Sequence, residues 1–497
     1  FVVPAEGRDV FQNFVLPIPL ERARFVEALE LRPGNKRVAH HATIKVDRTA
    51  SSRTLDAESK EPGYPGMEMA LSESPGGQIL GWTPGAIAHR APSGMGWTME
   101  PGTDLIVQLH LVPNGKEEPI QPSVAIYFTD TPPAKKLMVL RMRKEEIDIP
   151  PGERAYLAEN SITLPVAARL SIVYPHAHYL GKRIEVSATF PDGTQQILIL
   201  IEDWDFFWQS EYRYRTPLPL PPGTRITMRY LFDNSADNPR NPNSPPLRVR
   251  SGNSSADEMA TLTMQLETEG AEARKALTEA VCRQRVEEYP NLWPARLNLG
   301  AILAEQGKLE EAATHLAAGL ALAPENVELH MNLGAVQASL GRLPEALASL
   351  REALRLGPGN ANVLVNLAQV ESMGGNFAAA AEHYRAVLAA SPRDGRALRG
   401  LGTTLVRLER LDEAAAAFEQ ALALDPRDFQ AHFQLGKLAF RANRLEDATR
   451  HFQAGLALQP LAEAHQDLAR VFTARGMPAE AARELEAAKK LGGGKRR

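Results

Sequence analysis

The chain has 497 residues, of which 44% are hydrophobic and 23% are charged, and this is enough material for two or three domains with buried cores. The formal net charge of −4 gives no basic surface that would favour nucleic acid as a partner. The single cysteine, Cys282, excludes a disulfide within the chain, and no run of about 18 apolar residues predicts a transmembrane segment.

Residues 1–268 are predicted to form β-structure. Short apolar runs of strand length alternate with clusters of Pro, Gly, Asn and Asp, such as Pro132-Pro133 and Pro150-Pro151-Gly152. Such an alternation of strand and turn signals is typical of antiparallel β-sandwiches. A boundary near residues 129–136 divides the region into an N-terminal sandwich, 1–132, and a C-terminal sandwich, 133–268.

Five of the 12 histidines fall into three clusters before residue 180, namely His40-His41, His110, and His176 with His178. Alternate residues of a β-strand share one face, so the two histidines of an H-x-H sequence form a natural bidentate clamp for a metal ion. Two such imidazoles without a ligand would place two polar rings on a largely apolar face. We therefore interpret the strand expected over residues 170–180 as metal-binding.

The other candidates are ambiguous by themselves. His110 lies in an apolar strand expected to be buried on both faces, where a histidine is more often an ordinary core residue. His40 and His41 are neighbours and would point to opposite faces unless a bulge or a strand end intervenes. Met259 means little alone, because most methionines pack in cores. Together, imidazoles and one thioether suit a copper ion that changes oxidation state.

From about residue 290 a repeat of 34 residues is visible in the sequence. It appears in three series, at Pro290, Pro324, Pro358, Pro392 and Pro426, at Leu299, Leu333, Leu367, Leu401 and Leu435, and at Ala312, Ala346, Ala380, Ala414 and Ala448. A sixth copy is one residue short. The pattern resembles the tetratricopeptide repeat, which implies an all-α solenoid over 293–497, preceded by a helical linker over 269–292.

The resemblance implies that paired antiparallel helices present a concave groove to a protein or peptide partner. The alternative is that the array only stabilises or dimerises the rest of the protein.

Residues 30–268 resemble the copper type II, ascorbate-dependent monooxygenases, the family of peptidylglycine α-hydroxylating monooxygenase and dopamine β-monooxygenase. Four motifs carry the resemblance and occur in the family's order: His40-His41, Gln108-Leu109-His110, His176-Ala177-His178-Tyr179-Leu180-Gly181-Lys182 and Asp257-Glu258-Met259.

The resemblance implies two jelly-roll-like sandwiches, each holding one copper ion. His40, His41 and His110 would hold an electron-reservoir copper, and His176, His178 and Met259 would hold the oxygen-binding copper. The implied reaction hydroxylates a substrate C–H bond with dioxygen and an external electron donor, either ascorbate or a redox protein. The substrate is expected to be small or peptidic. Export to the periplasm or the extracellular space is expected by the same resemblance, although no signal peptide is visible in this chain.

Departures from the family bear on the substrate. Tyr174 stands where the peptide-amidating branch has a carboxylate-binding arginine, and Thr261 and Thr263 stand where that branch has Asn and Tyr. Peptidylglycine is therefore an unfavourable substrate.

Two other classes of protein stay open. A copper-binding or copper-delivery protein on a repeat scaffold would have the same ligands without turnover. A zinc hydrolase is disfavoured, because methionine is a poor zinc ligand and no acidic residue is placed as a water-activating base.

Overall fold

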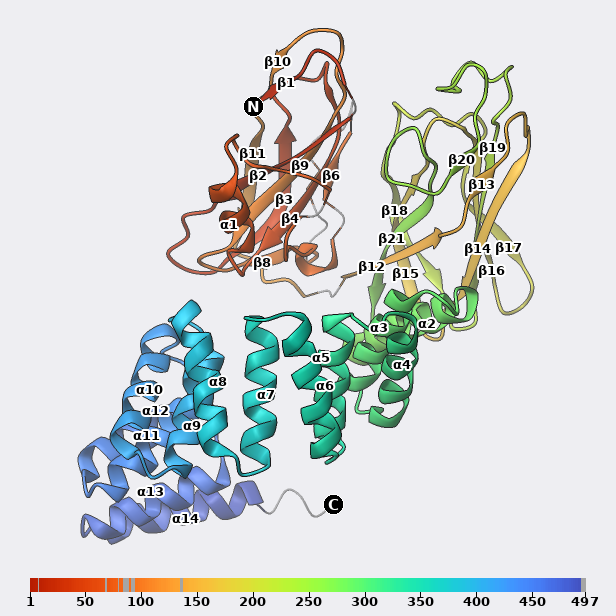
Figure 1. The fold of residues 1–497 in the computed structure, drawn as a ribbon. Helices are drawn as coiled ribbons and strands as arrows, with labels where there is room; N and C mark the ends of the chain where they lie inside the picture. The colour runs from red at the N-terminus through yellow and green to blue at the C-terminus, as the bar shows by residue number, and fades with distance from the viewer. Residues whose placement is uncertain are drawn as a thin grey trace. The chain divides into compact units, whose positions relative to one another are not determined.

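The computed structural model describes residues 1–7, 9–67, 69–78, 80–83, 89–90, 94–134 and 137–492. These residues form two compact units, 1–284 and 285–497. The first is rich in β-strands and the second is an array of helices (Figure 1). Across the described ranges, no helix combines the length and the hydrophobicity that are needed to cross a lipid bilayer.

The first half of the β-rich unit contains two main sheets. The five-stranded sheet has the order β5 (Tyr64–Pro65), β2 (Val10–Pro17), β9 (Asp104–Leu111), β4 (Ala39–Asp47) and β6 (Gly81–Trp82). The four-stranded sheet contains β11 (Ser123–Thr129), β3 (Arg24–Arg32), β7 (His89–Arg90) and β8 (Trp97–Met99). The remaining elements are the pair β1 (Val2–Val3) and β10 (Glu118–Pro119), helix α1 (Ser51–Glu58) and the 3-10 turn η1 (Pro75–Gly77).

The second half repeats the arrangement with two four-stranded antiparallel sheets. One has the order β12 (Leu137–Lys144), β21 (Ala260–Thr268), β15 (Ala168–His176) and β18 (Tyr212–Leu220). The other has the order β14 (Tyr156–Thr163), β19 (Arg225–Phe232), β16 (Gly181–Thr189) and β17 (Gln195–Ile201). A short pair joins β13 (Asp148–Ile149) to β20 (Val249–Arg250).

Each half has its own hydrophobic core, because alternate residues of its strands point to the same side. In the first half, Ile44 and Leu109 of the five-stranded sheet pack in one cluster with Val26 of the other sheet. In the second half, Val173 of one sheet and Met228 of the other are both fully buried in one cluster. The outward-facing residues of β4 and β15 therefore do not pack in these cores.

Helix α2 (Gly270–Glu288) follows the last strand, and the division between the two units falls within it. Leu277 on its first half is fully buried in the core of the second β-half, and Val281 packs against the same core. Farther along α2, the side-chain amide of Gln284 donates to Oδ1 of Asn160 at 2.8 Å. These contacts fix the start of the helix on the β-sheets.

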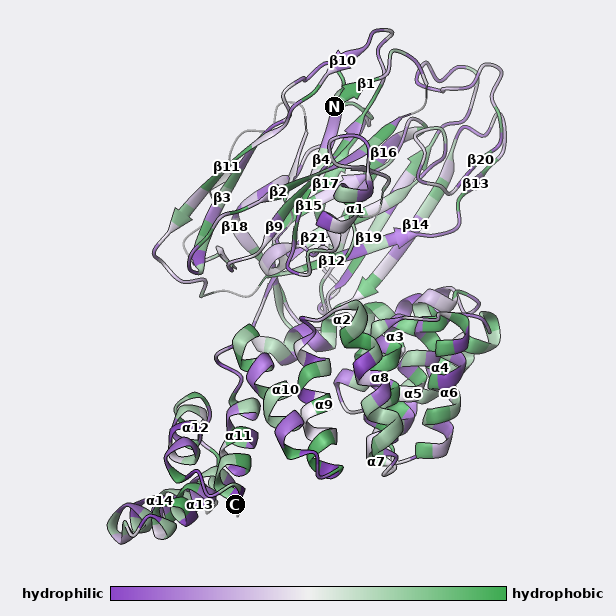
Figure 2. Ribbon diagram, turned by 60° about the vertical axis from the view of Figure 1, so that its left-hand side comes forward, coloured by the Kyte–Doolittle hydropathy of each residue, from purple (hydrophilic) through white to green (hydrophobic). Residues whose placement is uncertain are grey.

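The helical unit consists of six antiparallel helix pairs in the part of the chain that is described. They are α3 (Trp293–Glu305) with α4 (Leu309–Leu322), α5 (Val327–Ser339) with α6 (Leu343–Leu356), α7 (Ala361–Met373) with α8 (Phe377–Ala390), α9 (Gly395–Arg407) with α10 (Leu411–Leu424), α11 (Phe429–Arg441) with α12 (Leu445–Leu458) and α13 (Ala462–Ala474) with α14 (Pro478–Gly492). Figure 2 shows that both hydrophobic and hydrophilic residues occur along these helices.

Small residues at a fixed phase explain how the helices of a pair approach each other. Ala346 and Ala414 are fully buried between paired helices. A Cβ atom added to Gly334 would lie 2.6 Å from Cγ of Leu350, and one added to Gly402 would lie 2.8 Å from Cζ of Phe418. The predicted helical repeat is therefore confirmed, including its sixth copy.

Candidate metal centres

The first candidate centre, which we call site H, is formed by His40 and His41 on β4 and by His110 on the neighbouring strand β9. The β4–β9 register shifts between Ala39 and His41, which is the bulge that two neighbouring histidines need if they are to face one ion. One nitrogen of each ring lies within 4.8 Å of the others. The structure thus brings together three residues that are up to 70 positions apart in sequence.

Protein acceptors lie next to the outer ring nitrogens of His40 and His110. Nε2 of His40 lies 2.9 Å from the carbonyl oxygen of Phe206, and Nε2 of His110 lies 3.0 Å from Oδ2 of Asp9. A carbonyl oxygen only accepts hydrogen bonds, and so does an ionised carboxylate. We therefore assign the proton of each ring to Nε2, which leaves the lone pair on Nδ1.

These two Nδ1 atoms face each other at 3.3 Å, and Nδ1 of His41 lies 3.0 Å from that of His40. Two lone pairs do not form a hydrogen bond. Two nitrogen ligands at about 2.0 Å from a tetrahedral ion are separated by about 3.3 Å. The chemistry and spacing of the three nitrogens therefore fit a metal ion.

The carboxylate of Asp9 remains ionised in this setting. Burial alone raises the pKa of Asp9, but hydrogen bonds from His110 and Ser255 outweigh that effect and hold the pKa below its usual value. An ionised Asp9 keeps the proton of His110 on Nε2. Such a carboxylate–histidine contact orients a metal ligand and raises its basicity.

The second candidate centre, which we call site M, involves His176, His178 and Met259. The β-strand predicted over 170–180 ends earlier, because β15 stops at His176 and His178 lies in the turn that follows. The two imidazole rings are nevertheless close, with centroids 5.1 Å apart and planes at 87°. The two histidines of the predicted clamp therefore lie at and just beyond a strand end, and not on one continuous strand face.

Both histidines of site M direct Nδ1 toward a protein oxygen. Nδ1 of His176 lies 2.5 Å from Oε1 of Gln209, and Nδ1 of His178 lies 3.0 Å from the carbonyl oxygen of Asp257. Both partners are acceptors, so the rings carry their protons on Nδ1 and the Nε2 lone pairs are available to a metal. Site M would thus bind through the nitrogen opposite to the one used in site H.

Glu258 joins the segment of Met259 to the segment of His178. Its side chain is completely buried. Oε2 accepts the backbone N–H groups of His178 at 2.9 Å and of Met259 at 3.0 Å, so these two amide nitrogens lie within about 6 Å of each other. Oε1 accepts the N–H group of Leu180 at 2.6 Å. The backbone of Met259 is therefore held near that of His178.

The electrostatics of both sites favour neutral imidazole, which is the form that binds metals. Burial, together with the neighbouring histidines, lowers the pKa of His40 to about 4 and that of His176 to about 3. Burial also lowers the pKa values of His41 and His178. Four nitrogen ligands are therefore available at neutral pH without competition from protons.

The two sites are adjacent within the β-rich unit. The ring centroid of His41 in site H lies 6.2 Å from that of His176 in site M. The Asp203–Ser210 segment links them, because the carbonyl oxygen of Phe206 accepts hydrogen bonds from both His40 and the side-chain amide of Gln209. One short segment thereby orients a histidine in each site.

The aromatic cluster of this segment has two environments. Trp204 and Phe206 are almost completely buried, and the ring of Phe206 stacks on that of His40 with centroids 4.3 Å apart. Phe207 and Trp208 are exposed to solvent, at 55% and 63%. The first two residues therefore belong to the core, whereas the last two lie at the surface.

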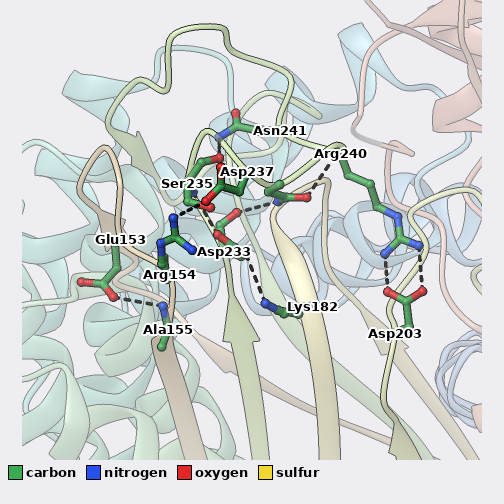
Figure 3. A network of polar contacts seen from close by, with 11 residues as sticks. Glu153, Arg154, Ala155, Lys182, Asp203, Asp233, Ser235, Asp237, Arg240 and Asn241 are labelled. Carbon is green, nitrogen blue, oxygen red and sulfur yellow. Dashed lines mark hydrogen bonds and ion pairs between the residues drawn. The ribbon is translucent and has the colours of Figure 1, made fainter.

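The loop at 233–246 is held in place by polar contacts (Figure 3). The fully buried Asn234 donates to three backbone carbonyl groups. Arg240 forms a bidentate ion pair with Asp203 and also donates to the carbonyl oxygen of Trp204. The loop therefore braces the start of the segment that carries Phe206 and Gln209.

Sequence reasoning did not identify the orienting residues Asp9, Phe206 and Gln209. Asp9 stands about 100 residues from its partner His110, and Phe206 acts through its backbone oxygen, so neither leaves a local pattern. Glu258 was part of a recognised motif, but its role depends on backbone groups of another segment.

Among known proteins, the family model of the tetratricopeptide repeat matches residues 297–361, 365–429 and 401–461. The C-terminal unit is therefore an array of tetratricopeptide repeats, a fold that supports protein–protein interaction. No curated protein matches the chain.

Several solved structures are similar to the chain. They include pilF of Pseudomonas aeruginosa, at 19% identity over 40% of this chain and 91% of that chain with a TM-score of 0.38. A tetratricopeptide repeat protein from Parabacteroides merdae is 20% identical over 44% of this chain and 88% of that chain, with a TM-score of 0.38. MamA from Desulfovibrio magneticus is 25% identical over 34% and 94%, with a TM-score of 0.32. These TM-scores are low, and they add nothing to the match of the family model.

Proposed function

We propose that residues 1–268 form two jelly-roll-like β-sandwiches that bind two copper ions and act together as a monooxygenase. The reaction converts a substrate C–H bond to C–OH. One atom of dioxygen enters the product and the other leaves as water, with two electrons and two protons supplied by an external reductant such as ascorbate. Copper, when bound, would supply one-electron redox chemistry and a place for dioxygen.

The observation that carries the proposal is the arrangement of His40 and His110 in site H. His40 and His110 each donate Nε2–H to an acceptor and face each other across 3.3 Å. Without a cation this buried contact is repulsive, whereas a bound ion makes it favourable. Three neutral imidazoles suit copper in either oxidation state.

The composition of site M supports a different role for that site. Two imidazoles with the thioether of Met259 form a softer ligand set, which favours the reduced state in which copper reacts with dioxygen. Gln209 and Asp257 would hold the two rings, and Glu258 would hold the backbone of Met259. The adjacency of His41 and His176 supports electron transfer from site H to site M.

The repeat array would recruit a protein or peptide, such as a substrate carrier or a redox protein. The family match supports a role in protein–protein interaction. The identity of the partner is left to experiment, and the catalytic proposal does not depend on it.

The experiment is oxygen uptake by the copper-loaded full chain in the presence of ascorbate, followed with an oxygen electrode. We expect uptake that is lost in Met259→Ala and His110→Ala but kept in His330→Ala, a histidine of the repeat array. Bound copper without any uptake above free copper would overturn the monooxygenase proposal and favour the copper-delivery alternative.

A further inference from the structure

A cavity of about 450 Å³ lies beside the two sites within the β-rich unit. One wall is the outward face of β4, where Thr43 and Lys45 line the cavity. The facing wall is the outward face of the sheet that contains β12, β21 and β15. Three tryptophans, Trp82, Trp97 and Trp208, line the cavity as well.

The sheet wall has a defined polar row. Arg141 on β12 pairs in register with Thr263 on β21, and Thr263 pairs with Tyr174 on β15. All three residues line the cavity. The arginine therefore projects from the same face as Tyr174, and His176 lies on that face in the next row, two residues along β15.

Two cations of the cavity have no anionic partner. Among the residues that the structure describes, neither Arg141 nor Lys45 forms an ion pair or a side-chain hydrogen bond. Burial lowers the pKa of Lys45, and so does the positive charge of Arg141. By contrast, Arg213 in the same cavity is paired with Glu211 at 2.5 Å. Arg141 is exposed and Lys45 is half-buried, so both cations are accessible to an anion, which the two like charges would attract.

The position of these cations sets the dimensions of a ligand. Lys45 lies four residues along β4 from His41, which is about 13 Å between Cα atoms, and Tyr174 lies about 7 Å from His176. A group held by Arg141 and Lys45 is therefore separated from both metal sites by several bonds. The tryptophans offer flat, apolar surfaces for the intervening part of the ligand.

We propose that this cavity binds an elongated organic carboxylate, with its carboxylate group between Arg141 and Lys45 and its apolar body directed toward His176. The carboxylate would replace the repulsion between the two cations by charge-assisted hydrogen bonds. That such a molecule is the substrate rests on the proposed function, whereas the carboxylate site itself does not require copper.

The test is isothermal titration calorimetry of the metal-free full chain with four carboxylates that differ in their apolar groups: acetate, hexanoate, benzoate and 4-phenylbutyrate. The longer carboxylates should bind better than acetate. The isosteric 4-phenylbutan-1-ol and 4-phenylbutylamine should bind at least about tenfold more weakly than 4-phenylbutyrate, because they lack the negative charge.

Variants of Arg141 and Lys45 test whether these two cations bind the carboxylate. Arg141→Met and Lys45→Met should each weaken binding of 4-phenylbutyrate by about tenfold or more, whereas Arg169→Met, on β15 but outside the cavity, should leave it unchanged. Arg141→Glu should reverse the preference and favour 4-phenylbutylamine.

Failure of all four carboxylates to bind, or equal binding of 4-phenylbutyrate to Arg141→Met and to the unmodified chain, would overturn the proposal. Because the titration needs no copper, binding without oxygen uptake would reject the monooxygenase function while preserving the carboxylate site. Oxygen uptake without carboxylate binding would reject the carboxylate site while preserving the monooxygenase function.

Discussion

Glu258→Ala tests how site M is held together. The substitution removes the acceptor of three backbone N–H groups, those of His178, Leu180 and Met259. A buried donor left without a partner costs about 1–3 kcal/mol, and water entering the space offsets part of that cost. We expect a loss of about 3–5 kcal/mol in the free energy of unfolding of the β-rich unit. Glu258→Gln keeps one acceptor oxygen, so its free energy of unfolding should lie between that of the unmodified chain and that of Glu258→Ala.

The assay is urea unfolding followed by tryptophan fluorescence, together with the copper content of each variant. Site M should lose its copper in Glu258→Ala, while site H keeps its own, because the ligands of site H do not contact Glu258. Glu159→Ala, which removes an exposed partner of Arg229, is the control and should change stability by less than about 1 kcal/mol. Unchanged stability together with two copper ions in Glu258→Ala would refute the role of Glu258.

Three further predictions follow from the same contacts. Gln209→Leu removes the acceptor of His176 Nδ1 and should weaken copper binding at site M by about 10–100-fold in a competition titration, and equal affinity would contradict the orienting role. Gly402→Ala places a Cβ atom 2.8 Å from the ring of Phe418 and should destabilise the repeat array by about 1–3 kcal/mol in thermal unfolding, whereas Gly395→Ala, with open space at its Cβ, should not. In the metal-free protein the unfolded chain takes up protons on His40 and His176 near pH 6.5, while the folded chain does so only near pH 4 and 3. Stability measured by urea unfolding should therefore fall as the pH drops below 6.5, by about 1.4 kcal/mol per histidine for each pH unit, and a flat profile between pH 7 and 5 would be the contrary result.

The sequence predicts the helical array well because its information is local. A proline, a leucine and an alanine recur every 34 residues, and each marks a position within one helix pair. The fully buried Ala346 and the close approach of Gly334 to Leu350 show that packing between neighbouring helices enforces that recurrence. Because packing requires the same residues in every repeat, the pattern can be recognised from the sequence without knowledge of distant contacts.

Site H was predictable in part. The grouping of its three histidines follows only from the family resemblance, whereas the need for a bulge or a strand end at His40-His41 follows from strand geometry, and the register shift before His41 shows the bulge. The tautomers do not follow from sequence, because they depend on Asp9 and on the backbone of Phe206. Those partners meet the rings only after folding.

Site M shows the limit of strand periodicity. Tyr174 and His176 are two residues apart on β15 and share one face of the strand. The strand ends at His176, however, and the side chain of Glu258 accepts hydrogen bonds from backbone N–H groups of the turn that follows. A buried glutamate side chain that accepts three N–H groups from two segments leaves no periodic pattern. The cavity with Arg141 and Lys45 was likewise not foreseen, because these two residues come from different β-halves.

The most direct measurement is the copper content per chain of the purified protein after loading and desalting, determined by mass spectrometry of the metal. We expect two copper ions in the unmodified chain, one in His110→Ala, one in His176→Ala and two in His330→Ala. A chain that holds no copper, or one whose copper content is the same in all four proteins, would contradict the claim that two separate ligand sets bind copper.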